Sequence, residues 1–164
     1  MTRKAFQDYY PDDFSHCYGC GRLNEQGHHI KSYWDGQETV AVFHPEEYHT
    51  ALPGYVYGGM IASLIDCHGT GSASAAAYRE QGREMGSEPA LRFVTASLQV
   101  DFLRPTPLAP LTLRGTIEEV KEKKVVVGVT VSSGDAVCAK GRVVAVLMPK
   151  SMMPKKENVH GIED

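Results

Sequence analysis

The residues best suited to chemistry lie in one segment, GYVYGGMIASLIDCHGTGS, between Gly54 and Ser72. Two adjacent glycines, Gly58 and Gly59, open an apolar stretch with helical spacing, and Asp66 follows within it. The first N–H groups of a helix have no partner inside the helix, so they can bind a developing negative charge. A carboxylate in an apolar helix is costly unless it is paired or functional. The combination indicates acyl transfer, with an oxyanion site and an acidic base or nucleophile.

The composition is typical of one globular domain. The chain has 164 residues, 42% hydrophobic and 23% charged, with a net charge of −3. A negative balance offers no attraction to nucleic acid or to an anionic membrane surface. No apolar run approaches the roughly 20 residues of a membrane span, and the N-terminus lacks the apolar core of a signal peptide. We therefore expect a cytoplasmic protein that binds neither nucleic acid nor membrane.

The apolar pattern predicts strands, one long helix and then strands again. Two β-like runs flank Asp35-Gly36, a strong hairpin signal, and apolar residues at i, i+3 and i+4 predict the helix. The expected elements are strands over 29–34 and 39–43, a loop over 44–57, a helix over about 58–81, and strands over about 94–102, 111–118, 125–131 and 137–147. One helix with an antiparallel sheet of five to six strands is an α+β arrangement.

Two details concern how the helix and the sheet meet. The second half of the helix is almost entirely small and includes Gly69 and Gly71, although a helical glycine costs about 1 kcal/mol relative to alanine. Close approach of a sheet would explain them. In the strand over 94–102, apolar residues at even positions alternate with polar residues at odd positions, which predicts that Thr95 lies on the polar face.

The chain ends are expected to carry little regular structure. We expect an irregular segment over 1–26 that contains a Cys-x-x-Cys turn, a domain over 27–149, and a mobile tail over 150–164.

The four cysteines allow more than one interpretation. Cys17 and Cys20, with nearby histidines, have the spacing of a zinc knuckle; the alternative is a turn that holds no metal. The histidines in question are His16, His28 and His29. Cys67 and Cys138 lie in apolar segments and are interpreted as small core residues. We predict no metal and no redox cofactor for the reaction.

Four motifs in order resemble the hotdog-fold acyl-CoA thioesterases of the phenylacetate-degradation type, over about residues 17–148. They are CYGCG with Asn24 and Gly27, GYVYGGMIASLID, TASLQVDFLRPTPL, and DAVCAKGRVVAV. The resemblance implies a hotdog fold, in which a curved antiparallel sheet wraps a long central helix, and a dimer.

The resemblance also implies roles for individual residues. The Gly58 N–H, with Gly59 beside it, would polarise the thioester carbonyl, and Asp66 would attack it or activate water. Thr95 matches a hydroxyl that holds the water in some members. The chain departs from the family in two places: Tyr57 stands where a histidine is usual, and Ala51 where some members have asparagine. Tyr57 can donate a hydrogen bond, and two nearby histidines, His49 and His68, could compensate at the substrate.

Distance along the helix predicts that the site is shared. Eight helical residues between Gly58 and Asp66 span about 12 Å, too far for both groups to reach one carbonyl carbon. We therefore expect a homodimer, or a pair of such dimers, that binds acyl-CoA between subunits. Two rival functions remain open. One is a hydratase or dehydratase that pairs Asp66 with His68 or His49, and the other is an acyl-CoA-binding module without catalysis.

Overall fold

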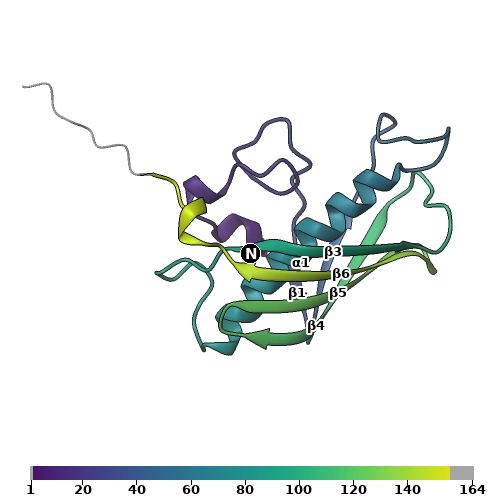
Figure 1. Cartoon of the computed structure of the whole chain (residues 1–164). Coiled ribbons are helices and arrows are strands. Elements are labelled where there is room, and N and C mark those ends of the chain that lie inside the picture. The colour runs from purple at the N-terminus through teal and green to yellow at the C-terminus, as the bar shows by residue number, and fades with distance from the viewer. Residues whose placement is uncertain (1, 156–164) are drawn as a thin grey trace, which may run out of the picture.

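The computed structural model describes residues 2–155, and its six strands form one antiparallel sheet (Figure 1). The strand order is β1-β2-β4-β5-β6-β3. The elements are η1 (Phe6–Tyr9), η2 (Asp12–Phe14), β1 (Tyr33–Asp35), β2 (Glu38–Phe43), α1 (Gly58–Glu80), β3 (Phe93–Phe102), β4 (Leu111–Lys121), β5 (Lys124–Ser133), β6 (Ala136–Leu147) and η3 (Lys150–Met152). The predicted α+β hotdog architecture is therefore confirmed, as is the hairpin at Asp35-Gly36, where β1 turns into β2.

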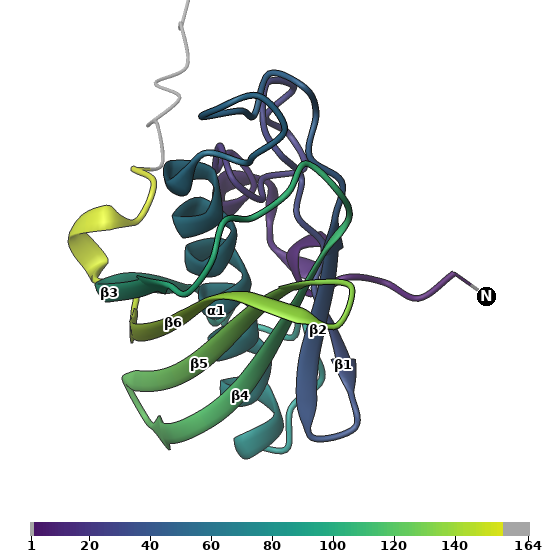
Figure 2. The ribbon, with the colours of Figure 1, turned by 90° about the vertical axis from the view of Figure 1, so that its right-hand side faces the viewer.

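The sheet curves around α1, and strands β3 to β6 all pack against it (Figure 2). Leu64 and Ile65 of the helix lie in one apolar core with Val127 and Val143 of the sheet. Every residue from Cys67 to Tyr78 is buried. A helix buried on all sides does not carry the polar stripe of a surface helix, so its second half consists mostly of small residues, and the few polar ones are buried.

Close approach explains both Gly69 and Gly71 of α1, but the sheet is the predicted neighbour only at Gly69. A Cβ added at Gly69 would lie 2.5 Å from Cγ2 and 2.8 Å from Cβ of Val143 on β6. A Cβ at Gly71 would lie 2.6 Å from Nε2 of Gln7 in the N-terminal segment. The helix is therefore in close contact with the sheet on one side and with the N-terminal segment on another.

The strict alternation predicted for β3 is wrong, because the strand contains a β-bulge at Ala96. Its pairing with β6 shifts register between Thr95 and Ser97. Thr95 pairs with Ala145 and Leu98 with Val143, and both partners are fully buried. Because opposite residues of an antiparallel pair share a face, Thr95 and Leu98 both face the helix. A bulge adds one residue to a strand, and here it moves Thr95 to the helix face.

The N-terminal segment packs closely against α1 despite its irregular backbone. Its two 3-10 turns, η1 and η2, bring Phe6 and Tyr10 into the interior, and the Phe6 N–H donates to the Ser32 carbonyl at 2.9 Å. At the other end, Lys150–Met152 forms the turn η3, while residues 156–164 of the predicted mobile tail lie outside the described residues. Within residues 2–155, no helix combines the length and apolarity that crossing a bilayer requires.

We expect Gly69→Ala to destabilise the protein, although alanine favours helices. The methyl group would overlap Val143 at its branched Cβ, and overpacking of this kind costs about 1–3 kcal/mol. Gly71→Ala is the matched control, because its only close neighbour is the end of the Gln7 side chain. Urea unfolding should give a clearly larger loss for Gly69→Ala; equal or higher stability than the wild type would contradict the close approach.

Candidate active site

The start of α1 presents unpaired backbone donors. Tyr57 is the N-cap residue and gives no side-chain cap. Its own N–H donates to the His49 carbonyl at 2.9 Å, and its carbonyl accepts the N–H of Met60 at 3.1 Å. Within residues 2–155, no backbone acceptor is found for the N–H of Gly58 or Gly59. These two groups can therefore stabilise a negative charge at the positive end of the helix.

Neighbouring aromatic rings leave little room for a side chain at either glycine. A Cβ at Gly59 would lie 2.3 Å from the Tyr57 ring, so the ring lies across the first turn of the helix. A Cβ at Gly58 would lie 3.3 Å from the ring tip of Phe102, the last residue of β3. No local sequence signal marks Phe102, because only the folded strand brings it to the helix start.

The structure brings Asp66 and Thr95 together. The Thr95 hydroxyl donates a hydrogen bond to Oδ1 of Asp66, and the β-bulge in β3 makes this contact possible. The Asp66 side chain belongs to a half-buried residue. One carboxylate oxygen is thus held by the strand, and the other has no protein partner within the described chain. Asp66 and Thr95 form one half of the candidate site, which we call the acid half.

Within one chain, the acid half and the helix start do not meet. Gly58 and Asp66 belong to the same continuous helix, so the rise of about 1.5 Å per residue separates them by about 12 Å. A reacting carbonyl must lie within about 3 Å of both an oxyanion donor and the attacking group. A single subunit therefore holds two incomplete halves.

A pocket of about 380 Å³ opens beside the helix start. Its walls include two predicted substrate-binding residues, Tyr57 and His49, and also Met60 of α1. The remaining lining residues are Tyr18, Gln26, Gly27, His28, Phe43, His44, Glu46 and Tyr48. The walls thus combine aromatic rings with histidines.

Two histidines face each other in this pocket. The rings of His28 and His49 lie 5.3 Å apart. Nδ1 of His49 accepts the backbone N–H of Glu46 at 2.9 Å, so the proton of the neutral His49 ring lies on Nε2. Burial lowers the pKa of His28, and charge on His49 and His29 lowers it further. The pocket therefore favours a neutral His28.

His68, also predicted to bind substrate, lies inside the subunit and not in this pocket. The residue is fully buried. Its Nδ1 is bonded to the Ser32 hydroxyl at 2.9 Å and its Nε2 to the Thr39 hydroxyl at 3.1 Å. Burial lowers the pKa of His68 to about 4. Because both ring nitrogens are occupied, we leave His68 out of the proposed site.

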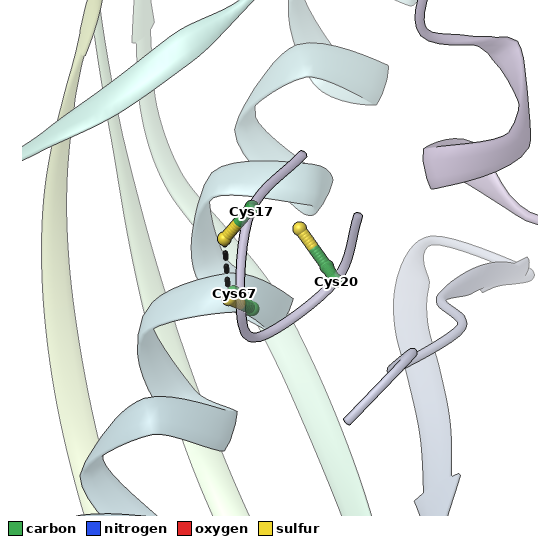
Figure 3. A group of neighbouring side chains, drawn as sticks. All are labelled: Cys17, Cys20 and Cys67. Atoms are coloured by element: carbon green, nitrogen blue, oxygen red, sulfur yellow. Dashed lines mark hydrogen bonds between the residues drawn. The ribbon is translucent and has the colours of Figure 1, made fainter. Parts of the chain in front are cut away.

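Three of the four cysteines converge beside the acid half (Figure 3). The Sγ atoms of Cys17, Cys20 and Cys67 all lie within 4.8 Å of one another, and those of Cys17 and Cys67 are 3.8 Å apart. Hydrogen bonds from Cys20 and Cys67 lower the pKa of Cys17, while the bond to Cys17 raises the pKa of Cys20 to about 12. Cys67 is buried as predicted, but its position beside Cys17 and Cys20 was not predicted.

The comparisons with known proteins agree with this architecture. Residues 53–140 match the thioesterase superfamily. A thioesterase superfamily protein from Shewanella loihica is 51% identical; the match covers 85% of this chain and 100% of that one, with a TM-score of 0.64. No curated protein matches the chain.

Two more distant structures share the fold. A phenylacetic acid degradation-related protein from Ralstonia eutropha is 16% identical, with 72% of this chain and 84% of that chain covered and a TM-score of 0.61. The PaaI protein of the E. coli phenylacetic acid degradation operon is also 16% identical, with 73% and 80% covered and a TM-score of 0.58.

We expect His68 to make the protein less stable in acid. Its folded pKa of about 4 lies below the ordinary 6.5, so between these values the unfolded chain binds a proton that the folded chain does not. The free energy of unfolding should therefore fall as the pH is lowered from 6.5 to 4, by about 3 kcal/mol in total. Urea unfolding of the wild type and of His68→Gln at pH 7 and pH 4.5 checks this. If both proteins lose the same free energy of unfolding between pH 7 and pH 4.5, His68 is excluded as the cause.

Proposed function

The chain belongs to the thioesterase superfamily, and on that premise we propose that it hydrolyses acyl-CoA thioesters at a site shared by two copies. The observation that carries the proposal is the placement of two half-sites along one strand. Thr95, near the start of β3, is bonded to Asp66, and Phe102, at the end of β3, lies against Gly58. Each half has the chemistry that the other lacks.

In the proposed reaction, the N–H groups of Gly58 and Gly59 bind the thioester oxygen. Charge grows on this oxygen as the carbonyl carbon becomes tetrahedral, and each donor of this kind contributes about 3–4 kcal/mol to the transition state. Asp66 either attacks the carbon or takes a proton from the attacking water. The CoA sulfur then leaves as a thiolate, which is stable enough to depart without a strong acid. Thr95 holds one Asp66 oxygen, which leaves the second for the reaction.

The register of β3 supports a two-fold arrangement that joins the halves. Thr95 and Phe102 both face the helix, because their partners on β6 are the buried residues Ala145 and Ala139. In an antiparallel pair, opposite residues share a face. A two-fold axis at Gln99 would pair Leu98 with Val100 of the partner subunit, and because the bulge takes up Ala96 it would place Thr95 opposite Phe102 of the partner subunit. Asp66 would then face Gly58 of the partner subunit.

The exposure of β3 also supports this pairing. The strand is ten residues long and lies at the edge of the sheet, bonded to β6 alone within the described chain. Leu98 and Phe102 are 38% and 56% exposed, and Leu103 just beyond is 52% exposed. Long apolar edge strands are prone to aggregation unless they are covered. Pairing with the same strand of a second copy would cover the edge.

The pocket beside the helix start offers space for part of the substrate. Its volume of about 380 Å³ falls within the range of about 300–1,000 Å³ that is typical of small-molecule sites. Tyr57 lies between this pocket and the two free N–H groups. We propose that Tyr57, with His49, contacts the substrate next to the reacting carbonyl.

The rival functions have less support in the geometry. A hydratase or dehydratase would pair the acid with a free histidine, yet both ring nitrogens of His68 are already bonded. His49 lies at the helix start, and its Nδ1 already accepts the Glu46 N–H, so only its Nε2 could act together with Asp66 of the partner subunit. A binding module without catalysis would need the bond from Thr95 to Asp66 only to satisfy a half-buried carboxylate, and it would leave the second carboxylate oxygen without a role.

We expect Asp66→Asn to lower kcat about 10²–10⁴-fold, because an amide neither attacks nor accepts the water proton. Thr95→Val should lower it less, because the carboxylate remains and only its orientation is lost. Thiol release, measured over a panel of aliphatic and aromatic acyl-CoA substrates, checks both variants. Asp135→Asn is the matched control: it makes the same change at an exposed carboxylate in the turn between β5 and β6, outside both half-sites and outside β3, and it should retain full turnover. Full turnover by Asp66→Asn would exclude the proposed mechanism.

We expect two inactive variants to restore activity when they share a dimer. Gly58→Pro removes the N–H donor, and proline is favoured at the first helical position. Tyr57, the residue before it, already has the extended backbone (φ −73°, ψ 146°) that a residue preceding proline prefers. Refolding this variant with an equal amount of Asp66→Asn should recover about a quarter of the wild-type rate, because half of the dimers are mixed and each contains one intact site.

The controls separate chemistry from folding. Gly58→Ala carries a similar contact with Phe102 but keeps the N–H, so it measures the cost of the side chain alone. Sedimentation must give dimers for each variant separately and for the mixture. Dimers that mix freely but recover no turnover would place both halves of the site within one subunit.

A further inference from the structure

We propose that Cys17, Cys20 and Cys67 form a tri-thiolate site for a soft, divalent cation such as Zn²⁺, a site distinct from the reacting groups of the thioesterase. The three Sγ atoms come from two segments far apart in sequence, the N-terminal loop and α1, and all lie within 4.8 Å of one another (Figure 3). Thiolates are the ligands that select Zn²⁺ and similar soft ions over harder cations.

The spacing of the sulfur atoms suits one bound ion. Two thiolates on a tetrahedral Zn²⁺, with bonds of about 2.3 Å, lie about 3.8 Å apart. Cys17 and Cys67 have this separation. A disulfide would use two of the three sulfurs and leave the third without a function. A metal ion uses all three.

The loop that carries Cys17 and Cys20 is built to lie on the helix. A Cβ at Gly19 would lie 2.2 Å from Sγ of Cys67, and one at Gly21 would lie 2.4 Å from the backbone N of Cys17. The Gly21 N–H donates to the Cys17 carbonyl at 2.7 Å, and the Ile30 N–H donates to the Gly19 carbonyl at 3.2 Å. The two glycines let the loop come close enough for its thiols to reach Cys67.

A positive charge beside the cluster provides a second, independent observation. Arg92 is half-buried, and its guanidinium lies 4.6 Å from the centre of the Tyr10 ring. No described carboxylate forms an ion pair with it. A half-buried cation that has no carboxylate partner is stabilised by a nearby anion, and three thiolates around a divalent ion carry one net negative charge.

A surface pocket gives the cluster a route to solvent. Cys17 and Arg92 line this pocket of about 190 Å³, together with His16 and Asp13. Three protein ligands leave the fourth position of a tetrahedral ion free, and water, His16 or Asp13 could take it from the pocket. Loading would release the thiol protons to solvent.

The first experiment counts the bound metal. The full chain is purified under reducing, chelator-treated conditions, loaded with Zn²⁺, freed of excess ion and analysed for zinc. We expect one ion per chain in the wild type and loss of the ion in Cys17→Ser and Cys67→Ser. Cys138→Ser is the matched control, since Cys138 is also a buried free cysteine but lies outside the cluster, and it should keep the ion.

A second readout does not depend on the count. Zn²⁺ should raise the melting temperature of the wild type and of Cys138→Ser but not that of Cys17→Ser, because an ion that binds only the folded chain stabilises it. Co²⁺ in place of Zn²⁺ should give a thiolate-to-metal charge-transfer band that the same variant loses. Cys17 is half-exposed, so Cys17→Ser keeps the test valid if Cys67→Ser fails to fold.

Two outcomes would overturn the site. One is that the reduced wild type binds no stoichiometric Zn²⁺, or that Cys17→Ser binds as much Zn²⁺ as the wild type does. The other is a cluster that binds no ion but loses two thiols to a disulfide under mild peroxide, which would identify a redox pair instead. Thioesterase turnover is measured in parallel, so that failure of the metal site and failure of the proposed hydrolysis are told apart.

Discussion

The structure depends on one constraint: α1 is surrounded by protein, so each successive residue along it meets a different neighbour. Consecutive helical residues point about 100° apart. Asp66 meets Thr95 on the edge strand β3, Cys67 meets Cys17 of the N-terminal loop, and His68 meets Ser32 and Thr39. Three adjacent positions therefore anchor the helix to three parts of the fold.

Polar groups inside such a helix must be satisfied by its surroundings. An unpaired buried polar group costs about 1–3 kcal/mol, and here the partners come from distant segments. Thr39 bonds both the His68 ring and the Ser72 hydroxyl, which joins β2 to two successive turns of α1. These bonds fix the rotation of the helix about its axis. The direction of the Asp66 carboxylate therefore follows from contacts made on the opposite side of the helix.

The sequence was enough to predict the order of the helix and the strands, although the first strand begins at Tyr33 and not at residue 29, but it did not predict the contacts that bulges and loops create. The helix starting at Gly58, the Asp35-Gly36 hairpin and the small residues for close packing followed from local patterns, because period and turn chemistry are local properties. The position of Thr95 did not, because one extra residue in β3 changes the face of everything before it. The meeting of Cys67 with the Cys17 loop did not either, since a buried cysteine has the same local pattern with or without sulfur neighbours.

The bulge connects the fold to the proposed assembly. Thr95 and Phe102 are seven positions apart, so in a regular strand they would point to opposite faces of the sheet. The extra residue at Ala96 brings both to the helix face, where one contacts Asp66 and the other Gly58. Only with both on this face can two antiparallel copies of β3 bring an acid half opposite a helix start. A single irregularity in an edge strand thus determines whether two incomplete half-sites can combine into complete ones.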